Sequence, residues 1–506
     1  MVRVTAMILF LSIWICTGDC DCLHAQDSVR DSVVKIHTTL RMPDYYRPWA
    51  KSSLRESGGT GVFIDCDIVG EGDYVLTNAH VVQFASQIYV QPNRTTNKLA
   101  ATIVAIAPGI DLALLKLDDP AESPDHERLP LAEELPRIKE TVNAYGFPIG
   151  GDELSITEGI VSRIEFAVFF FDVKGVRIQI DAALNPGNSG GPAVKNDHIV
   201  GLVFSGIREA DNIGYLISAD EIRLFLHDIE DGVYNGKPAV WGSFSSAEND
   251  ALREHLALDN TKTGIVVTEP YSDDEDYPLK RWDVITHLGS HSLDNRGKVQ
   301  VRDDLRLHSF YLVPQLVEKE GLELTVFRKG EELKVLLPVQ SDRDRLIPIL
   351  KYNQPEYAIF GPLGFTVAYH EVVRRLATHS KWGPYLMVSE NPLLERFNDK
   401  PAFPGEQLVI VPSKMFPHPM TNGYSSPRMD VLTHVNDQPV KSLSHLVELL
   451  RGATGEYLEF RFGGLAEALV FHREEFLEST EGILEAEGIR RRFSPRIREV
   501  WDSTGG

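Results

Sequence analysis

The sequence predicts a multidomain protein in which an all-β barrel or sandwich is followed by two smaller α+β modules. Residues 29–230 contain many short β-type runs bounded by glycine, such as Ile199–Phe204, and helical periodicity is scarce among them. Farther along the chain, the run Asp283–Leu288 recurs as Asp430–Val435. Each copy is followed by a polar turn, a helical stretch and a strand-like segment, so we expect the two modules to be related.

The composition of the 506 residues is that of an ordinary globular protein, with 43% hydrophobic and 25% charged residues. This apolar content is sufficient for several hydrophobic cores, and at roughly 150 residues per domain the length indicates about three domains. A disordered, collagen-like or disulfide-scaffold protein is excluded. The formal net charge of −22 argues against a nucleic-acid partner, because an acidic surface repels a phosphate backbone.

Residues 1–25 have the pattern of a cleaved secretory signal peptide, because a basic residue is followed by a short, mostly apolar run and then by small and polar residues. The cut is expected after Ala25; a lipid anchor on Cys20 or Cys22 and an uncleaved membrane anchor are the alternatives. Cleavage would leave Cys66 as the single cysteine and therefore no internal disulfide. No later segment is apolar over 18 consecutive residues, so no integral membrane segment is expected after cleavage.

The rest of the chain divides where its composition changes. A linker with glycine and proline ends the β-rich part, and a polar segment joins the two modules. Helical stretches are expected at residues 305–318 and 443–450. The expected units are residues 27–233 for the β domain, 235–343 for the first module, 350–472 for the second module and 473–506 for a peripheral helix or C-terminal tail.

Three motifs in the β domain supply a histidine, an aspartate and a serine in that order. His80 lies in the run Thr77–Val82 directly after a strand, Asp111 precedes an apolar strand, and Ser189 lies in the glycine-rich run Asn185–Pro192. Each residue alone has an ordinary structural interpretation, as a core histidine, a turn former or a loop serine. Their combination in this order predicts the catalytic groups of an acyl-transfer enzyme.

Acyl transfer requires each of these groups. A serine hydroxyl is a weak nucleophile at neutral pH and needs a base; histidine has a suitable pKa, and a buried carboxylate fixes the histidine tautomer. The surrounding glycines allow the backbone N–H groups of Gly187 and Ser189 to converge as an oxyanion hole, in which one donor is worth roughly 3 kcal/mol. Gly190 and Gly191 keep side chains away from the substrate carbonyl.

These motifs resemble those of the HtrA/Deg family of trypsin-like serine proteases, over roughly residues 28–472. Two further segments, Arg41–Trp49 and Gly405–Val411, resemble the plant-type Deg branch, whose second PDZ domain is degenerate. The resemblance implies a trypsin-like double β-barrel followed by two α+β PDZ-like domains. It also implies no nucleotide, metal or other cofactor, and assembly from trimers into larger cages. By resemblance, the triad is His80, Asp111 and Ser189, and the oxyanion donors are Gly187 and Ser189.

The resemblance also places the primary substrate pocket. Ala183, six residues before the serine, is expected at its base, and Leu202–Gly206 as its wall strand, so Val203 and Ser205 are further lining candidates. Without a carboxylate at the base, cleavage after Lys or Arg is disfavoured, because a buried unpaired cation is costly. Cleavage after small to medium apolar residues is expected. The alternative is that Val203 and Phe204 belong only to the core.

Regulation and peptide binding are less specified. Asn188, not an aspartate, precedes the serine, so activation by a freed amino terminus is not expected, and control is expected in loops such as residues 205–213. In the first module, the candidate carboxylate-binding loop Val240–Phe244 departs from the usual PDZ glycine pattern, which leaves peptide binding open. In the second module, Gly361–Phe365 offers that pattern but is expected to begin a structural strand.

An aromatic cluster lies near the start of the β domain. Tyr45, Tyr46 and Trp49 fall within five residues, which is more than a small barrel is expected to bury alone. Exposed together they would form an apolar patch, and such patches mark interfaces. The family resemblance places this segment near the trimer contact of the protease domain or its regulatory loop. We therefore expect an oligomer contact here, with a position in the core as the alternative.

The predicted function is that of a secreted or periplasmic serine endopeptidase that degrades unfolded or damaged proteins without ATP. The alternative is a chaperone or peptide-binding scaffold whose protease domain is latent. A small-molecule esterase is a third, weaker possibility. Digestion of casein by the wild type and by a serine variant distinguishes the three.

Overall fold

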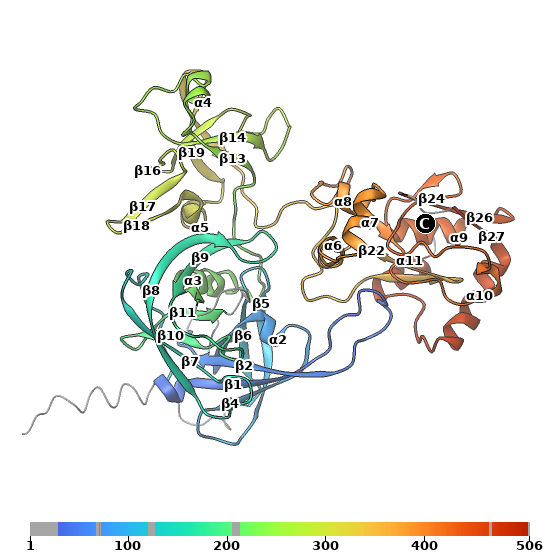
Figure 1. The fold of residues 1–506 in the computed structure, drawn as a ribbon, viewed down its shortest axis with the longest axis horizontal. Coiled ribbons are helices and arrows are strands. Elements are labelled where there is room, and N and C mark those ends of the chain that lie inside the picture. Colours follow the sequence, from blue (N-terminus) through green and yellow to red (C-terminus); the bar gives the residue numbers. More distant parts are fainter. Residues whose placement is uncertain are drawn as a thin grey trace, which may run out of the picture.

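The structure, a computed structural model, describes residues 29–66, 70, 72–119, 127–204, 213–464 and 468–503. They form a barrel unit in blue to green, a middle unit in yellow-green and a C-terminal unit in orange to red (Figure 1). The barrel unit contains two closed barrels, and each of the other units is built on an antiparallel sheet. The predicted fold class is confirmed. The signal peptide predicted at residues 1–25 lies outside the described residues.

Each barrel is a closed ring of six strands, in the order β1-β2-β3-β6-β5-β4 and β10-β11-β12-β9-β8-β7. The first barrel consists of β1 (Val33–Leu40), β2 (Arg55–Phe63), β3 (Tyr74–Thr77), β4 (Ala85–Pro92), β5 (Leu99–Ala107) and β6 (Leu112–Leu117). The second barrel consists of β7 (Thr141–Gly146), β8 (Ser155–Val168), β9 (Lys174–Ile180), β10 (Pro192–Lys195), β11 (His198–Phe204) and β12 (Gly214–Ser218). Helix α2 (Ala79–Val82) follows β3, and helix α3 (Ala219–Asp228) follows β12.

Alternating side chains explain how the barrels close and where they join. In β1, Val34 and Ile36 are fully buried in the first barrel, whereas Lys35 and His37 are partly exposed. A separate apolar cluster joins the two barrels, with Leu76 of the first packed among Phe147 and Leu202 of the second. This shared seam holds the strand ends of both barrels in one rigid arrangement.

The middle unit is a sheet with the strand order β13-β14-β15-β19-β20. Its elements are β13 (Gly242–Ser246), α4 (Asp250–His255), β14 (Ile265–Pro270), β15 (Val284–Leu288), β16 (His291–Ser292), β17 (Lys298–Arg302), β18 (Leu305–His308), η3 (Ser309–Leu312), α5 (Val313–Leu316), β19 (Leu322–Arg328) and β20 (Glu331–Leu337). The prediction of a helix at residues 305–318 is wrong for residues 305–308, which form strand β18 and pair with β17.

The C-terminal unit is a sheet with the strand order β21-β22-β23-β24-β26-β27. Its elements are β21 (Tyr357–Phe360), β22 (Leu363–Val367), α6 (His370–Ala377), α7 (Trp382–Val388), α8 (Pro392–Glu395), β23 (Val409–Ile410), η4 (Pro419–Thr421), β24 (Val431–Val435), β25 (Gln438–Pro439), α9 (Leu443–Gly452), β26 (Tyr457–Phe462), β27 (Leu469–His472), α10 (Arg473–Ala486) and α11 (Pro495–Asp502). The sequence repeat falls on equivalent strands, because β15 pairs with β19 and β24 pairs with β26.

Residues beyond 472 are part of the C-terminal unit. We expected a peripheral helix or tail there, but Phe476 of α10 and Ile497 of α11 are fully buried in the core of the unit. The segment between the two helices lies against the edge of β21, where Ile359 N–H donates to the Arg492 carbonyl. The mixed charges that suggested a tail lie on the outer faces of these helices, and the apolar residues between them pack inward.

A loop of the first barrel reaches the C-terminal unit. Residues 41–54, named the strap here, leave β1 and return as β2 (Figure 1). The Trp49 ring lies 5.3 Å from the Phe416 ring and 6.2 Å from the Tyr357 ring, centroid to centroid. Gly364 makes room for this contact, because a Cβ at that position would come within 2.5 Å of the Trp49 ring.

The other strap aromatics are covered by the same unit. Tyr45 and Tyr46 pack partly buried against its core. The guanidinium group of Arg375 lies 5.9 Å from the Tyr45 ring, and that of Arg428 lies 5.2 Å from the Tyr46 ring. The expectation that these aromatics form an exposed patch is wrong, because residues more than 300 positions away cover them.

The middle unit packs on the second barrel. Leu305 and Leu307 of β18 join the core cluster of that barrel, and the Arg302 guanidinium donates to two backbone carbonyls of the barrel unit. In the linker between the two units, Lys237 Nζ lies 2.7 Å from the buried carboxylate of Glu221 on α3. The position of the middle unit is therefore fixed by both apolar and charged contacts.

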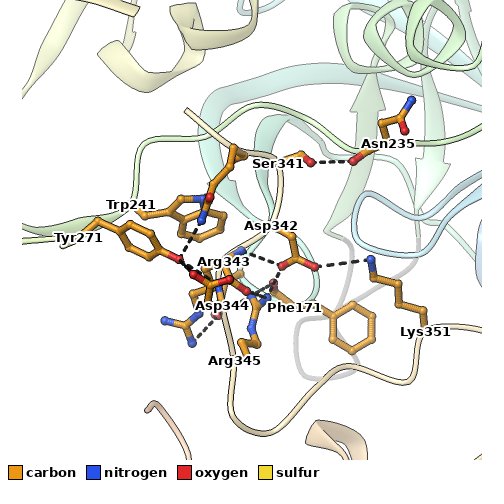
Figure 2. Close-up of polar contacts among 12 residues, drawn as sticks. Phe171, Asn235, Trp241, Tyr271, Ser341, Asp342, Arg343, Asp344, Arg345 and Lys351 are labelled. Carbon is orange, nitrogen blue, oxygen red and sulfur yellow. Dashed lines mark hydrogen bonds and ion pairs between the residues drawn. The ribbon is translucent and has the colours of Figure 1, made fainter. Parts of the chain in front are cut away.

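The three units meet at the segment that leads into the C-terminal unit (Figure 2). Arg345 donates to the carbonyl of Phe171, at the tip of the β8–β9 hairpin, and pairs with Asp342. Tyr271 of the middle unit accepts a 2.9 Å hydrogen bond from the backbone N–H of Asp344. A single short segment thus contacts both preceding units.

Candidate active site

His80 and Asp111 come together from neighbouring strand ends of the first barrel. His80 lies in α2, the short helix directly after β3, and Asp111 lies in the turn between β5 and β6. The Asp111 carbonyl accepts hydrogen bonds from the Asn78 side chain at 3.0 Å and from the Ala79 N–H at 3.2 Å. Asp111 adopts a φ of 61°, a left-handed conformation that aspartate tolerates better than most residues.

The two side chains form a direct contact. His80 Nδ1 lies 2.7 Å from Asp111 Oδ2, and the His80 backbone N–H donates to Asp111 Oδ1 at 2.9 Å. A carboxylate only accepts hydrogen bonds, so Nδ1 carries the proton and Nε2 is left as the basic nitrogen. The aspartate side chain is 2% exposed and that of the histidine 44%. Burial lowers the pKa of His80, but the charge and the hydrogen bond of Asp111 outweigh burial and raise this pKa above 6.5.

The serine loop of the second barrel lies against the same strand ends. Ser189 is buried, and its carbonyl accepts a 2.9 Å hydrogen bond from the Thr60 N–H of β2. A Cβ on Gly190 would collide with the Thr60 carbonyl and the Thr77 hydroxyl, and its φ of 87° also favours glycine. The loop therefore packs against Thr77, the last residue of β3, which lies three residues before His80. This close contact is possible only because glycine follows the serine.

Gly187, a predicted oxyanion donor, has a left-handed backbone conformation that favours glycine. Its φ is 105°, and a Cβ would lie 2.5 Å from the Ile149 nitrogen and the Phe147 carbonyl. The Pro186 carbonyl accepts a 2.8 Å hydrogen bond from the Ile149 N–H. Because carbonyl and N–H are antiparallel across a planar trans peptide, the Gly187 N–H points away from Ile149. The loop is thus held with this donor turned outward.

Thr60 fixes this loop, and sequence reasoning missed it. Its hydroxyl donates to the Gly187 carbonyl at 2.8 Å and accepts from the Phe147 N–H at 2.9 Å, while the residue is fully buried. The available signal was a lone threonine inside the glycine run Gly58–Gly61. Such a polar residue at the buried end of a strand needs partners, and here both partners are backbone groups of the active-site loops.

The predicted pocket residues have separate outcomes. Ala183 is exposed and lies two residues before the serine loop. The side chain of Val203 is fully buried in the core of the second barrel, as the alternative prediction for this residue has it. Its backbone instead holds the serine loop, donating to the Gly191 carbonyl at 2.8 Å. Ser205 lies outside the described residues, as does most of the predicted control loop at 205–213.

The candidate carboxylate loops of the smaller units differ. Val240–Phe244 borders a pocket of about 250 Å³ that also contacts Phe310, Lys174 and Arg343. In the C-terminal unit, the Gly361 N–H donates to the Thr480 hydroxyl of α10 at 2.8 Å. Helix α10 therefore covers the second loop, which continues as the structural strand β22.

The described residues contain neither a metal-binding cluster nor a membrane-spanning helix. No group of three or more His, Cys, Asp or Glu side chains in this part of the chain is arranged to hold a metal ion. None of its helices is long and apolar enough to cross a membrane.

Two domain families match the chain. The family described as trypsin-like peptidase domain matches residues 59–202, and the family described as PDZ domain matches residues 347–496. The first match contains His80, Asp111 and Ser189. The second match coincides with most of the C-terminal unit, including α10.

Similarity to characterised proteins extends over most of the chain. The chain is 33% identical over 484 residues to Protease Do-like 2, chloroplastic, of Arabidopsis thaliana, which covers 94% of this chain and 76% of the relative. It is 32% identical over 470 residues to Protease Do-like 4, mitochondrial, of the same plant, with coverages of 92% and 85%. The solved structure of an HtrA-type protease, AlgW with tripeptide, aligns with a TM-score of 0.48 and 25% identity over 63% of this chain and 96% of that one.

Proposed function

The chain belongs to the HtrA/Deg family of serine proteases, and on this premise we propose that it hydrolyses peptide bonds through His80, Asp111 and Ser189. The observation that carries the proposal is the 2.7 Å contact between His80 and the buried Asp111, formed beside the serine loop. A buried carboxylate, a half-exposed imidazole in contact with it and a serine at converging strand ends are the groups that acyl transfer needs.

In the proposed reaction, His80 Nε2 takes the hydroxyl proton as Ser189 Oγ bonds to the scissile carbonyl carbon. The carbonyl oxygen becomes an oxyanion, which the N–H groups of Gly187 and Ser189 stabilise. The C–N bond then breaks, and His80 gives its proton to the leaving amine. Water repeats the same steps on the acyl-enzyme and releases the acid, while Asp111 stays ionised and stabilises the imidazolium.

The proposed substrates are unfolded or damaged proteins, cleaved without ATP or a metal ion. Ala183 at the expected pocket base offers no carboxylate to a basic side chain, so cleavage is expected after Val, Ala, Ile or Leu. Mass spectrometry of casein fragments tests this, and a majority of ends at Lys or Arg would contradict it. Activity that EDTA removes and zinc restores would contradict the absence of a metal cofactor.

The decisive experiment is digestion of casein by the wild type and Ser189→Ala. Loss of the nucleophile is expected to reduce turnover by about six orders of magnitude, with unchanged circular dichroism. Ser292→Ala, which alters an exposed serine of the middle unit, is the matched control. Equal turnover by Ser189→Ala and wild type would refute the assignment, and an inactive wild type that still prevents aggregation of casein would support the latent-scaffold alternative.

A secreted or periplasmic location and a homo-oligomer, a trimer or its multiples, complete the proposal. The leader pattern of residues 1–25 supports the first, although the names of the two Arabidopsis relatives place those proteins in organelles. N-terminal sequencing of the mature protein, which is expected to start at Gln26, tests the leader. Light scattering tests the oligomer.

A further inference from the structure

A groove lies between the strap and the C-terminal unit. It has a volume of about 1130 Å³ and is lined by residues of the strap, by the segments around Tyr357 and Phe416, and by residues 487–496. Two units of the fold therefore contribute to its walls. The volume exceeds the roughly 300–1,000 Å³ of ordinary small-molecule pockets, which indicates an extended ligand.

The groove is strongly basic, in a chain whose net charge is −22. Seven basic side chains and two acidic ones line it. Two of the basic side chains are paired, Arg47 with Asp44 and Arg496 with Glu356. The other five have no carboxylate within ion-pair distance among the described residues: Arg41, Lys51, Lys414, Arg490 and Arg491.

Such a cluster of unpaired cations creates a positive potential that attracts anions. Charges within the Debye length of about 8 Å at physiological salt are not fully screened from one another. The chain is acidic overall, yet none of its described carboxylates pairs with these five cations. Arg490 and Arg491 are exposed at the mouth of the groove. Their position favours an acidic ligand over a purely structural role.

The floor of the groove is apolar. The Trp49 ring contacts the rings of Tyr357 and Phe416 there, and prolines from both units complete the lining. A ligand that matches both the apolar floor and the basic residues of the groove carries carboxylates together with an apolar side chain. Protein segments have this combination.

We propose that the groove binds an extended acidic segment of a partner protein, with its carboxylates on the five unpaired cations and an apolar side chain on the Trp49 floor. A long nucleic acid fits less well, because its phosphates beyond the groove would meet an acidic surface. A bilayer fits less well because the site is concave and a membrane surface is flat. Binding would link the strap to the C-terminal unit, since both supply contacts.

Fluorescence anisotropy tests the proposal on the full chain carrying Ser189→Ala, which prevents cleavage of the probe. The probe is a fluorescein-labelled peptide rich in Asp and Glu with a central Leu, and the control peptide carries Asn and Gln in place of the acids. We expect binding of the acidic peptide only, weakening as salt is raised. Arg490→Ala with Arg491→Ala is expected to reduce affinity by about tenfold, as for the loss of two partly exposed ion pairs.

The matched control is Arg498→Ala with Lys319→Ala, which removes two exposed cations outside the groove and is expected to leave the affinity unchanged. Absence of binding, equal binding of both peptides, or equal affinity of the two double variants would overturn the proposal. So would tighter binding of single-stranded RNA or of phosphatidylserine vesicles at this groove. Self-association that the Arg490/Arg491 variant abolishes, without peptide binding, would assign the groove to a second copy of the chain. None of these results depends on proteolytic activity.

Discussion

Asp283 and Arg328 form an ion pair in the middle unit, with 2.7 Å between the partly exposed guanidinium and the buried carboxylate. The repeat in the C-terminal unit lacks this pair. Asp430 occupies the position of Asp283, but the strand pairing places Gly464 where Arg328 stands. The Asn391 amide is 3.4 Å from the Asp430 carboxylate, and burial raises the pKa of Asp430 to about 6.

Asp430 is therefore expected to make the stability of the C-terminal unit depend on pH. The folded state holds a proton that the unfolded state, with a pKa near 3.8, releases. Stability falls as pH rises from about 4 to about 6, and the loss, up to about 3 kcal/mol, is complete above that window. Asp430→Asn should remove this dependence in thermal unfolding, whereas Asp437→Asn at the exposed surface should retain it. An unchanged pH profile in Asp430→Asn would refute the prediction.

The His80–Asp111 contact predicts the pH dependence of catalysis. His80 must be neutral to accept the serine proton, so kcat/KM should rise with pH around a midpoint above 6.5, because Asp111 raises the pKa of His80. Asp111→Asn should lower kcat by about four orders of magnitude and shift the midpoint down. The measurement is a pH–rate profile on a peptide substrate. A midpoint that does not move in a variant with residual activity would contradict this electrostatic role.

Thr60 is expected to be a positioning residue for the oxyanion loop. Thr60→Val keeps the shape but leaves the Gly187 carbonyl and the Phe147 N–H without the hydroxyl, at about 1–3 kcal/mol for each unsatisfied group. We expect kcat to fall by about tenfold to a thousandfold with KM little changed, and Thr60→Ser to restore it. Thr38→Val alters a buried threonine of β1 whose hydroxyl donates a long hydrogen bond, 3.3 Å, to the Ser57 carbonyl, and serves as the control. Equal kcat values for the two valine variants would count against the role.

Two independent changes should release the strap. Trp49→Ala removes the aromatic contact, and Gly364→Ala places a methyl group within 2.5 Å of the Trp49 ring. Both should increase hydrogen exchange in residues 41–54, and the loss of this partly buried indole should cost up to about 3 kcal/mol in docking. Leu54→Ala, an exposed strap residue, should have no such effect. Wild-type exchange in both variants would show that Trp49 does not hold the strap.

The features that could be predicted from the sequence are those encoded by neighbouring residues. The glycines around Ser189 and the strand before His80 are local signals, and the alternation in the barrels follows from the pleat. The charge pattern of residues 473–503 misled because it describes only their outer faces. The burial of Val203 depends on which face of β11 meets the barrel interior. The sequence of β11 is apolar on both faces and does not reveal this.

The rest required contacts between distant parts of the chain. The partners of Trp49 lie in β21 and beyond, and nothing within its own segment indicates them. The unpaired state of Asp430 was hidden by the resemblance of its own strand to that of Asp283, since the missing partner belongs to a different strand. The role of Thr60 depends on two backbone partners from distant loops, which its own glycine-rich segment does not indicate.

The strap also imposes an order on biosynthesis. Trp49 leaves the ribosome roughly 300 residues before Tyr357 does, and at about 5–20 residues per second this interval lasts about 15–60 s. During that time both barrels can be finished while three aromatic side chains of the strap have no cover. The nascent chain thus exposes an apolar surface at the strap, and this surface is covered only when the C-terminal unit has emerged and folded. A truncated transcript or a stalled ribosome would therefore produce a complete barrel unit whose strap aromatics remain exposed and prone to aggregation.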